Sequence, residues 1–299
     1  MKLEGIHFLL TYVCNYECDH CFLYCSPRSY GTFSISQIKE VLKEIEKIES
    51  IHSVSFEGGE PFLMYPLLLE AIRLSAKQGL KTAIETNSYW AVSEENAELW
   101  LKPLKEAGLG LLETSDDQYH FGDSSINPAS HARNAAKKLG IRISTICIDE
   151  PTDATLSNID KGEPVYQGSP KIHGRAVEKI APSMPVKSQT TFTECPYENL
   201  KDPGRVHLDA FGNIHLCQGI SMGNIWETPL SQLVSEYDPD SHPICGPLLK
   251  GGPLELANTH NVAIEDNCVS ACHFCTKTCL ELLDKFPQYL TPKQVYGIE

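Results

Sequence analysis

The sequence has no long apolar run and no secretion signal. Among its 299 residues, no stretch reaches the ~18 consecutive apolar residues of a membrane span. The first residues, Met1-Lys2-Leu3-Glu4-Gly5, lack the charged and apolar regions of a signal peptide. We therefore expect a cytoplasmic protein with no membrane partner. In that reducing compartment, the 12 cysteines should bind metal in preference to forming disulfides, which argues against a secreted disulfide scaffold.

Positive charge is also scarce. The chain has 25 Lys and Arg against 39 Asp and Glu, a formal net charge of −14. Binding along a nucleic-acid backbone needs a surplus of Lys and Arg, so we expect no nucleic-acid partner. A cationic peptide or a small polar substrate suits this charge. The length and the hydrophobic content of 41% predict one barrel-sized domain with an appendage.

Strand and helix patterns alternate over the first half of the chain. Strands are expected at residues 5–13, 54–56, 81–85, 110–114 and 141–148, with a possible sixth at 165–173. Helices are expected at residues 35–48, 66–76, 94–107 and 127–139. Repeated units of this length predict a parallel sheet, as a barrel or an open doubly wound sheet. No Gly-x-Gly-x-x-Gly stands beside the first strand, which argues against a Rossmann nucleotide site.

Three cysteines follow the first expected strand. Cys14, Cys18 and Cys21 have the spacing Cys-x3-Cys-x2-Cys, and Asn15 and Asp19 between them favour a loop. A loop can fold three sulfurs around one compact group, and soft thiolates suit an iron–sulfur cluster or zinc. Because no fourth cysteine follows in register, one metal position stays open for chemistry. A structural zinc loop with ligands elsewhere is the alternative.

This spacing resembles the cysteine loop of the radical S-adenosylmethionine superfamily. The resemblance implies that Cys14, Cys18 and Cys21 hold a [4Fe-4S] cluster whose remaining iron chelates S-adenosyl-L-methionine. Reduction would then cleave the cofactor to a 5′-deoxyadenosyl radical, which abstracts a hydrogen atom from a substrate carbon. The implied fold is α/β, a partial (β/α)6 TIM-like barrel with a small C-terminal cysteine-rich α+β domain.

Further motifs of this family stand at the ends of the next strands, where the working residues of such folds gather. Glu57-Gly58-Gly59-Glu60-Pro61 matches the family's GGE motif, which implies contact with the methionine amino group. Thr86 and Asn87 resemble the family's Thr-Asn-Gly segment, with Ser88 in place of the glycine. The residues expected to bind the cofactor are Gly58, Gly59, Glu60, Pro61, Thr86, Asn87 and Ser144.

A polar segment follows the fourth expected strand. Asp116, Tyr119 and His120 within it can hold substrate hydroxyl groups and are the expected catalytic residues of the substrate pocket. A solvated loop without a catalytic role is the alternative.

A second unit is expected after the barrel. The barrel is assigned to residues 1–185, with a connector at 149–190, and the second unit to residues 190–299. Gly174-Arg175-Ala176 resembles a segment found where the barrel ends in relatives with an extra cluster domain. Beyond it we expect a hairpin of residues 206–209 and 213–217. Cys195 before the hairpin and Cys217 at its end resemble the auxiliary-cluster domains called SPASM and twitch.

A run of further cysteines stands at helical spacing near the C-terminus: Cys268, Cys272, Cys275 and Cys279. A buried helical stripe is one explanation. On a straight helix the first and last would lie roughly 16 Å apart, too far for one cluster. Either Cys268, Cys272 and Cys275 wrap a cluster, or Cys272 and Cys275 join Cys195 and Cys217. We prefer the second arrangement, which matches the twitch pattern and predicts an auxiliary [4Fe-4S] cluster, with zinc as the alternative. It leaves five cysteines unassigned: Cys25, Cys147, Cys245, Cys268 and Cys279.

The chain resembles peptide-modifying members of the family, including epimerases with a Cys-Asp-His-Cys loop. We therefore expect oxidation, crosslinking or epimerisation of a peptide. In those epimerases a cysteine after the hairpin cysteine donates a hydrogen atom, whereas this chain has Gln218, which weakens epimerisation. Expected partners are a reductant such as flavodoxin or ferredoxin and a separate peptide-recognition protein, because no leader-binding segment precedes the first strand. The alternatives are a radical enzyme acting on a small metabolite and a non-catalytic iron–sulfur or zinc-binding protein.

Overall fold

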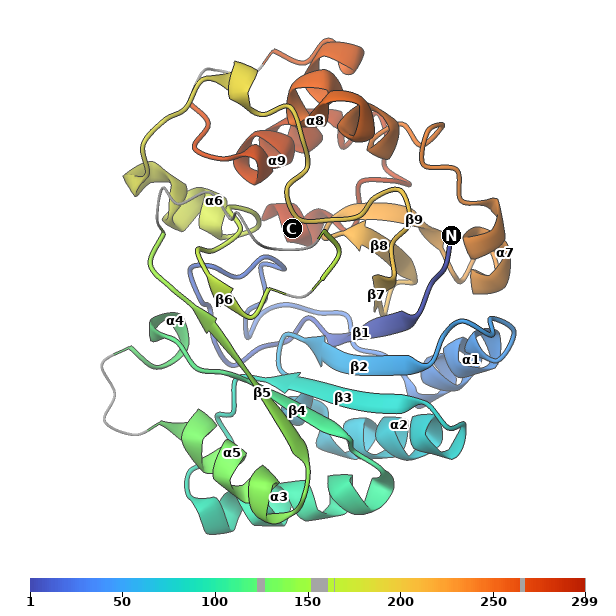
Figure 1. The fold of residues 1–299 in the computed structure, drawn as a ribbon, viewed down its shortest axis with the longest axis vertical. Coiled ribbons are helices and arrows are strands. Elements are labelled where there is room, and N and C mark those ends of the chain that lie inside the picture. Colours follow the sequence, from blue (N-terminus) through green and yellow to red (C-terminus); the bar gives the residue numbers. More distant parts are fainter. Residues whose placement is uncertain (123–126, 152–160, 164, 264–266, 299) are drawn as a thin grey trace.

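One continuous sheet forms the centre of the molecule (Figure 1). The computed structural model describes residues 1–122, 127–151, 161–163, 165–263 and 267–298. Within these ranges, nine strands lie in the order β6-β5-β4-β3-β2-β1-β7-β8-β9. The N-terminal half of the chain lies on one side of β1 and the C-terminal part on the other (Figure 1).

The first strands form the expected parallel βα repeat. They are β1 (Gly5–Thr11), β2 (Ser53–Gly58), β3 (Lys81–Thr86), β4 (Leu111–Ser115) and β5 (Arg142–Ile148). Successive side chains of a strand point to opposite faces of the sheet. In β1, Ile6, Phe8 and Leu10 are fully buried in the main core, whereas His7 lines a cavity on the other face. The α/β class expected from the sequence is therefore confirmed.

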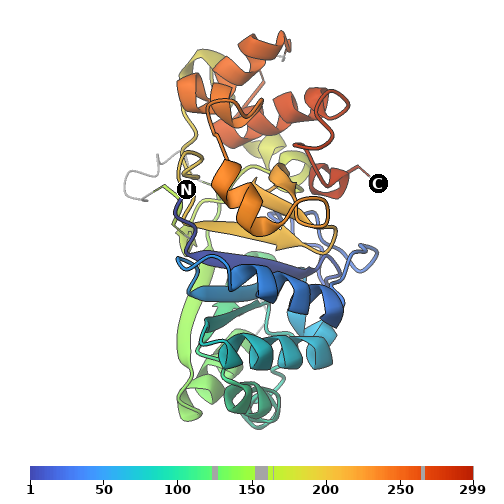
Figure 2. The same cartoon turned by 90° about the vertical axis from the view of Figure 1, so that its right-hand side faces the viewer.

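Helices cover the apolar face of this parallel part (Figure 2). They are α1 (Ile35–Ile45), the 3-10 turn η1 (Pro61–Met64), α2 (Tyr65–Lys77), α3 (Glu94–Ala107) and α5 (Pro128–Lys138). Local capping explains where several of them begin. Ser34 forms a capping box with Gln37 at α1, and the side chains of Ser93 and Asn127 cap α3 and α5.

Two local expectations differ from the structure. The sixth strand, β6, covers only Gln167–Gly168 where residues 165–173 were expected. Gly168 has a φ of 114°, and Pro170 has no N–H for a ladder, so the strand cannot continue. The segment after β4 contains a short helix, α4 (Gln118–Phe121), because the Asp117 side chain accepts from the backbone N–H of His120. Residues 152–160 and 164 of the expected connector lie outside the described residues.

The expected hairpin is confirmed and extends the same sheet. It consists of β7 (Arg205–Asp209) and β8 (Asn213–Cys217), followed by the antiparallel β9 (Ile220–Asn224). β7 pairs in parallel with β1, so that His7 lies opposite His207. The division of the chain at residues 185–190 stays a prediction, and the sheet itself runs without interruption across β1 and β7.

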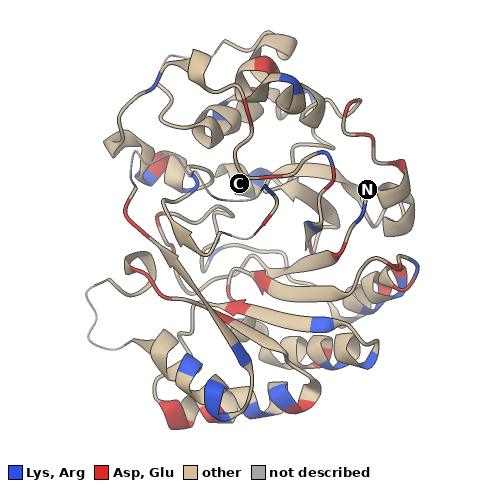
Figure 3. Cartoon of the chain, viewed as in Figure 1, with Lys and Arg blue, Asp and Glu red and all other residues tan. Residues whose placement is uncertain are grey.

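The remaining elements are mostly helical. They are α6 (Ala176–Lys179), η2 (Ala181–Ser183), η3 (Gln189–Thr191), α7 (Leu230–Glu236), α8 (Cys245–His260), α9 (Ala271–Leu282) and η4 (Lys293–Tyr296). The Ser270 side chain caps α9, so Cys268 precedes the helix. Within the described ranges no helix combines the length and apolarity needed to cross a membrane. Charges of both signs are mixed on the helices that cover the parallel part of the sheet (Figure 3).

Candidate functional site

The cysteine loop after β1 opens into a cavity at the carboxyl ends of the parallel strands. Cys14, Cys18 and Cys21 all line this cavity. No disulfide bond joins any of these thiols in the described chain. The structure therefore brings the three sequence-predicted thiols together.

Backbone N–H groups point at two of these sulfurs. The N–H of Tyr16 donates to Cys14 Sγ over 3.4 Å, and the N–H of Cys25 donates to Cys21 Sγ over 3.3 Å. A hydrogen bond from the Cys25 thiol lowers the pKa of Cys21 to about 6, whereas burial raises the pKa of Cys14 to about 12. Thiol donors on one loop, with N–H groups directed at the sulfurs, are the donor set that an iron–sulfur cluster needs. The residues present therefore fit a cluster.

Arg175 holds the outer side of the cysteine loop. Its guanidinium donates to the carbonyl of Cys18 over 2.8 Å and to the carbonyl of Cys25 over 2.6 Å. Its backbone N–H donates to the carbonyl of Cys21 over 3.0 Å. Gly174 beside it has a φ of 59°, and a Cβ there would lie 2.5 Å from the Cys21 carbonyl oxygen. From the sequence, Gly174-Arg175-Ala176 only indicated where the barrel ends. The contact of Arg175 with Cys25 joins residues about 150 positions apart, and a sequence pattern does not reveal such a tertiary contact.

The GGE motif is packed against the start of the cysteine loop. The N–H of Gly59 donates to Thr11 O over 2.7 Å, and the N–H of Glu60 donates to Val13 O over 2.9 Å. A Cβ on Gly59 would lie 2.2 Å from Val13 O, so only glycine permits this approach. Gly58 and Gly59 both line the cavity.

The Glu60 side chain is engaged inside the protein. Its carboxylate accepts from the N–H groups of Phe62 (3.0 Å) and Asn87 (2.8 Å) and from the Thr86 hydroxyl (2.9 Å). The residue is fully buried, and burial raises the pKa of its carboxyl to about 7. These bonds fasten the motif to the end of β3, and Pro61 is buried in the following turn. The contact of this motif with the methionine amino group stays a prediction.

The segment after β3 lies beside the cysteine loop. Thr86 and Asn87 line the cavity, and the Asn87 amide donates to Cys14 Sγ over 3.7 Å and to the Asn15 side chain over 2.9 Å. Ser88 has a φ of 62°, the left-handed conformation that glycine most readily adopts. The backbone shape of a Thr-Asn-Gly segment is thus kept with serine at its third position.

Of the three expected catalytic residues, one lines the cavity and the other two contact neighbouring side chains. His120 lines the cavity, and its Nδ1 lies 2.8 Å from Asp117 Oδ1. Asp116 is paired with Arg133 over 2.7 Å and is not among the described lining residues. The Tyr119 ring packs on His20, with ring centroids 4.6 Å apart. Ser144 on β5 lies outside the described lining, whereas Ile146, two residues further along β5, and its partner Ser115 on β4 belong to it.

A second cavity contains the four cysteines expected to share an auxiliary site. Its lining includes Cys195, Cys217, Cys272 and Cys275, and also Cys279. Burial raises the thiol pKa of Cys195, Cys217 and Cys272. A bound metal would offset this cost, because it ligates the thiolate form.

Four of the five unassigned cysteines lie away from this lining. Cys268 packs instead in a cluster with Phe192, Ala257 and Phe274. Cys245 is buried at the start of α8, and Cys147 lies on β5. Cys25 lines the first cavity beside Cys21. Cys268 is therefore not part of the described lining that contains Cys272 and Cys275, and the alternative in which these three cysteines share a cluster gains no support.

The chain is similar to several known proteins. Residues 8–156 match the Radical SAM superfamily. The putative peptide biosynthesis protein YydG of Bacillus subtilis (strain 168) is 30% identical over 256 residues, which cover 84% of this chain and 72% of that protein. The antilisterial bacteriocin subtilosin biosynthesis protein AlbA of the same organism is 34% identical over 99 residues, 33% of this chain and 21% of that protein. The crystal structure of BtrN in complex with AdoMet and 2-DOIA has a TM-score of 0.51 at 15% identity, and the match covers 77% of this chain and 81% of that one.

The chain belongs to the radical SAM superfamily. It is a radical SAM enzyme, and its cofactors are S-adenosyl-L-methionine and a [4Fe-4S] cluster. The likeness to BtrN is one of fold, and it confirms the partial TIM-like barrel that the sequence predicted.

Proposed function

We propose that this enzyme modifies a peptide by radical chemistry in the cavity beneath the loop of Cys14, Cys18 and Cys21. One observation carries the proposal. The three thiols open onto the interior of the barrel in a chain that matches a putative peptide biosynthesis protein over most of its length. The similarity to AlbA, a subtilosin biosynthesis protein, supports the same class of substrate.

Cys14, Cys18 and Cys21 would hold the cluster, and three thiolates leave one iron for S-adenosyl-L-methionine. When bound, this pair supplies reductive radical chemistry that removes a hydrogen atom from a substrate carbon. The chain itself orients these groups. Arg175 fastens the loop from outside the cavity, and Asn87 approaches Cys14 from the end of β3.

The cofactor would lie along the ends of β2 and β3. Gly58 and Gly59 offer backbone without side chains, so a ligand can approach closely. Glu60 would hold this surface in place through its bonds to Thr86 and Asn87. Pro61 and Ser144, also expected at the cofactor, would act from behind the lining residues.

The substrate would enter beside α4. His120 reaches the cavity, and Asp117 fixes the orientation of its ring. We assign substrate contact to His120. Asp116 and Tyr119 would act as positioning residues, because Asp116 is paired with Arg133 and Tyr119 packs on His20.

Anaerobic reconstitution with S-adenosylmethionine and dithionite tests the cluster assignment. The wild type should form 5′-deoxyadenosine, and the triple variant Cys14→Ala, Cys18→Ala, Cys21→Ala should form none. Cys147→Ala on β5 is the matched control and should retain activity, because it lies outside both described linings. Cofactor cleavage in the triple variant would contradict the assignment.

Deuterium transfer tests the peptide substrate. If a short open reading frame lies next to the gene, its product is the candidate peptide, which is made with deuterated residues. Deuterium should appear in 5′-deoxyadenosine when the correct residue carries the label. Transfer from a small metabolite, with none from the peptide, would favour the alternative of a metabolite-modifying enzyme. Product mass would separate oxidation or crosslinking from epimerisation, which needs a hydrogen donor other than Gln218.

Cys195, Cys217, Cys272 and Cys275 would hold an auxiliary [4Fe-4S] cluster. Their placement around one cavity supports this proposal. The double variant Cys272→Ala, Cys275→Ala should lose about half of the bound iron and keep the cofactor-cleaving cluster. Wild-type protein with zinc in place of the extra iron would favour the zinc alternative.

Reductant and peptide delivery would come from other proteins. Flavodoxin or ferredoxin is the proposed electron donor, and a separate recognition protein would present the peptide. Replacing dithionite by reduced flavodoxin should sustain 5′-deoxyadenosine formation.

A further inference from the structure

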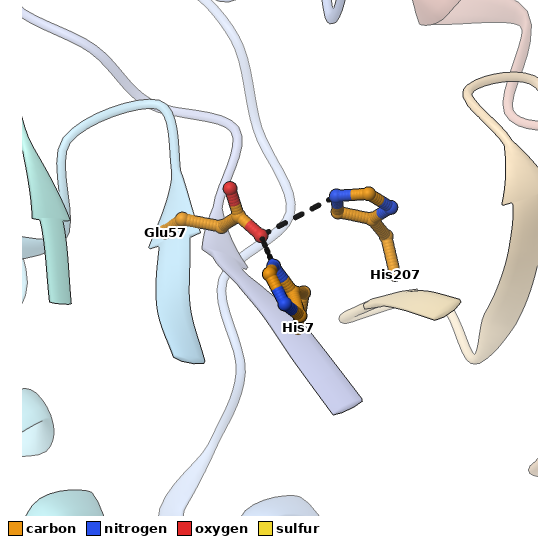
Figure 4. Close-up of side chains that lie close together, drawn as sticks. All are labelled: His7, Glu57 and His207. Atoms are coloured by element: carbon orange, nitrogen blue, oxygen red, sulfur yellow. Dashed lines mark hydrogen bonds and ion pairs between the residues drawn. The ribbon is translucent and has the colours of Figure 1, made fainter. Parts of the chain in front are cut away.

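Two histidines and a glutamate from three neighbouring strands converge on the face of the sheet that lines the cavity (Figure 4). His7 lies on β1, Glu57 on β2 and His207 on β7. His7 and His207 are direct neighbours in the β1–β7 ladder, and His7 lies opposite Ser55, two residues before Glu57. All three side chains line the cavity that also contains the cysteine loop.

The three potential ligand atoms are already close together. His7 Nδ1 lies 2.6 Å from Glu57 Oε1, and His207 Nε2 lies 3.4 Å from the same oxygen. All three atoms lie within 4.8 Å of one another. A tetrahedral ion with bonds of about 2.0–2.1 Å holds its ligand atoms about 3.3 Å apart. Small side-chain rotations would therefore bring these atoms to metal-binding distances.

We propose that His7, Glu57 and His207 bind one divalent first-row transition-metal ion, separate from the iron–sulfur sites. Two imidazoles and a carboxylate form the donor set of non-haem iron and of catalytic zinc sites. Three protein ligands leave at least one coordination position open. That position faces the shared cavity, where a water molecule or a substrate oxygen can occupy it.

Further carboxyl groups stand near the three ligands. Glu85 on β3 and Glu113 on β4 lie opposite one another in the ladder next to β2. Glu57 and Glu85 line the same cavity, together with the cation Arg205 on β7. A divalent ion would favour the deprotonated form of such carboxyl groups.

Two neighbouring side chains could support the ligands and the open position. The Gln218 amide lies 3.5 Å from His207 Nδ1 and can fix the ring. The Ser55 hydroxyl is buried and has no hydrogen-bond partner among the described residues. It can accept a bond from a metal-bound water.

Cobalt binding to the anaerobic, cluster-loaded enzyme tests this site. Co²⁺ should bind at one equivalent and give d–d absorption without thiolate-to-cobalt charge-transfer bands. Loss of a group that only supports a metal ligand lowers the affinity by up to about 100-fold. Glu57→Gln and His207→Gln remove a ligand itself, so each should weaken cobalt binding by more than about 100-fold. His52→Gln is the matched control, because His52 is exposed on the loop before β2, and it should bind as the wild type does.

Three results would overturn the proposal. One is wild-type enzyme that binds no cobalt beyond the cysteine sites. The second is a cobalt spectrum with thiolate bands. The third is unchanged affinity in Glu57→Gln, a variant that keeps the size of the side chain. Iron–sulfur absorbance equal to wild type shows that this variant is folded, so its loss of cobalt then reports on the site alone.

Discussion

Gly59 sets the distance between the GGE motif and the cysteine loop, and Gly59→Ala probes that contact. An added Cβ would lie 2.2 Å from Val13 O, 2.6 Å from Val13 C and 2.9 Å from Tyr12 O. All three atoms are backbone, so no side-chain rotation can relieve the overlap. Carbon in ordinary contact needs about 3.5–4.0 Å. The backbone at Val13 must therefore move by about 1 Å or more.

The displaced backbone is next to Cys14. Its movement would stretch or break the bond from the N–H of Glu60 to Val13 O, now 2.9 Å. Overpacking of this kind costs about 1–3 kcal/mol, and the lost hydrogen bond costs about 1 kcal/mol more. A misplacement of about 1 Å at a reacting centre lowers the rate about 100-fold. We therefore expect a folded but weakened protein with about 100-fold less cofactor cleavage.

The assay compares Gly59→Ala with the wild type and Gly204→Ala. A Cβ on Gly204 meets no atom within 4 Å, so this control should match the wild type. Iron content, thermal stability and the rate of 5′-deoxyadenosine formation are measured on all three proteins. A Gly59→Ala enzyme with wild-type iron content and wild-type rate would refute the role assigned to this contact.

Two further changes test other parts of the site. Arg175→Lys should leave the Cys18 or the Cys25 carbonyl without its donor, at about 1–3 kcal/mol, because an ammonium cannot reproduce the guanidinium fork. Iron retention during gel filtration measures this effect, and unchanged retention would argue against the clamp. Glu198→Gln should flatten the acid dependence of stability below about pH 4.5. Burial raises the pKa of Glu198, but the charges of Lys171 and Arg205 and the hydrogen bond from Lys171, 2.8 Å away, together outweigh burial and lower it. This stabilisation is therefore complete above the ordinary pKa and is lost as the pH falls. Urea unfolding across this pH range is the measurement, and parallel profiles for variant and wild type would contradict the assignment.

Most of the parallel barrel could be predicted from the sequence, because strand and helix periodicity are local. The helix at Glu94–Ala107 matches its expected limits, since Ser93 caps its start and Gly108 ends it in the left-handed conformation. The sixth strand was less predictable, because its length depends on whether the chain after Gly168 can pair with β5. The parallel pairing of β7 with β1 was not foreseen, as it joins residues about 200 positions apart.

The sequence by itself determined the chemical class. Cysteine spacing and the GGE motif are short-range patterns, and their thiols and glycines retain their chemistry wherever the fold places them. Tertiary structure alone decided which partners these groups meet. It turned the Glu60 carboxylate toward β3, set Arg175 against the cysteine loop, and brought His7 and His207 beside Glu57. Such contacts depend on strand order and side-chain direction across the sheet, which no spacing along the chain encodes.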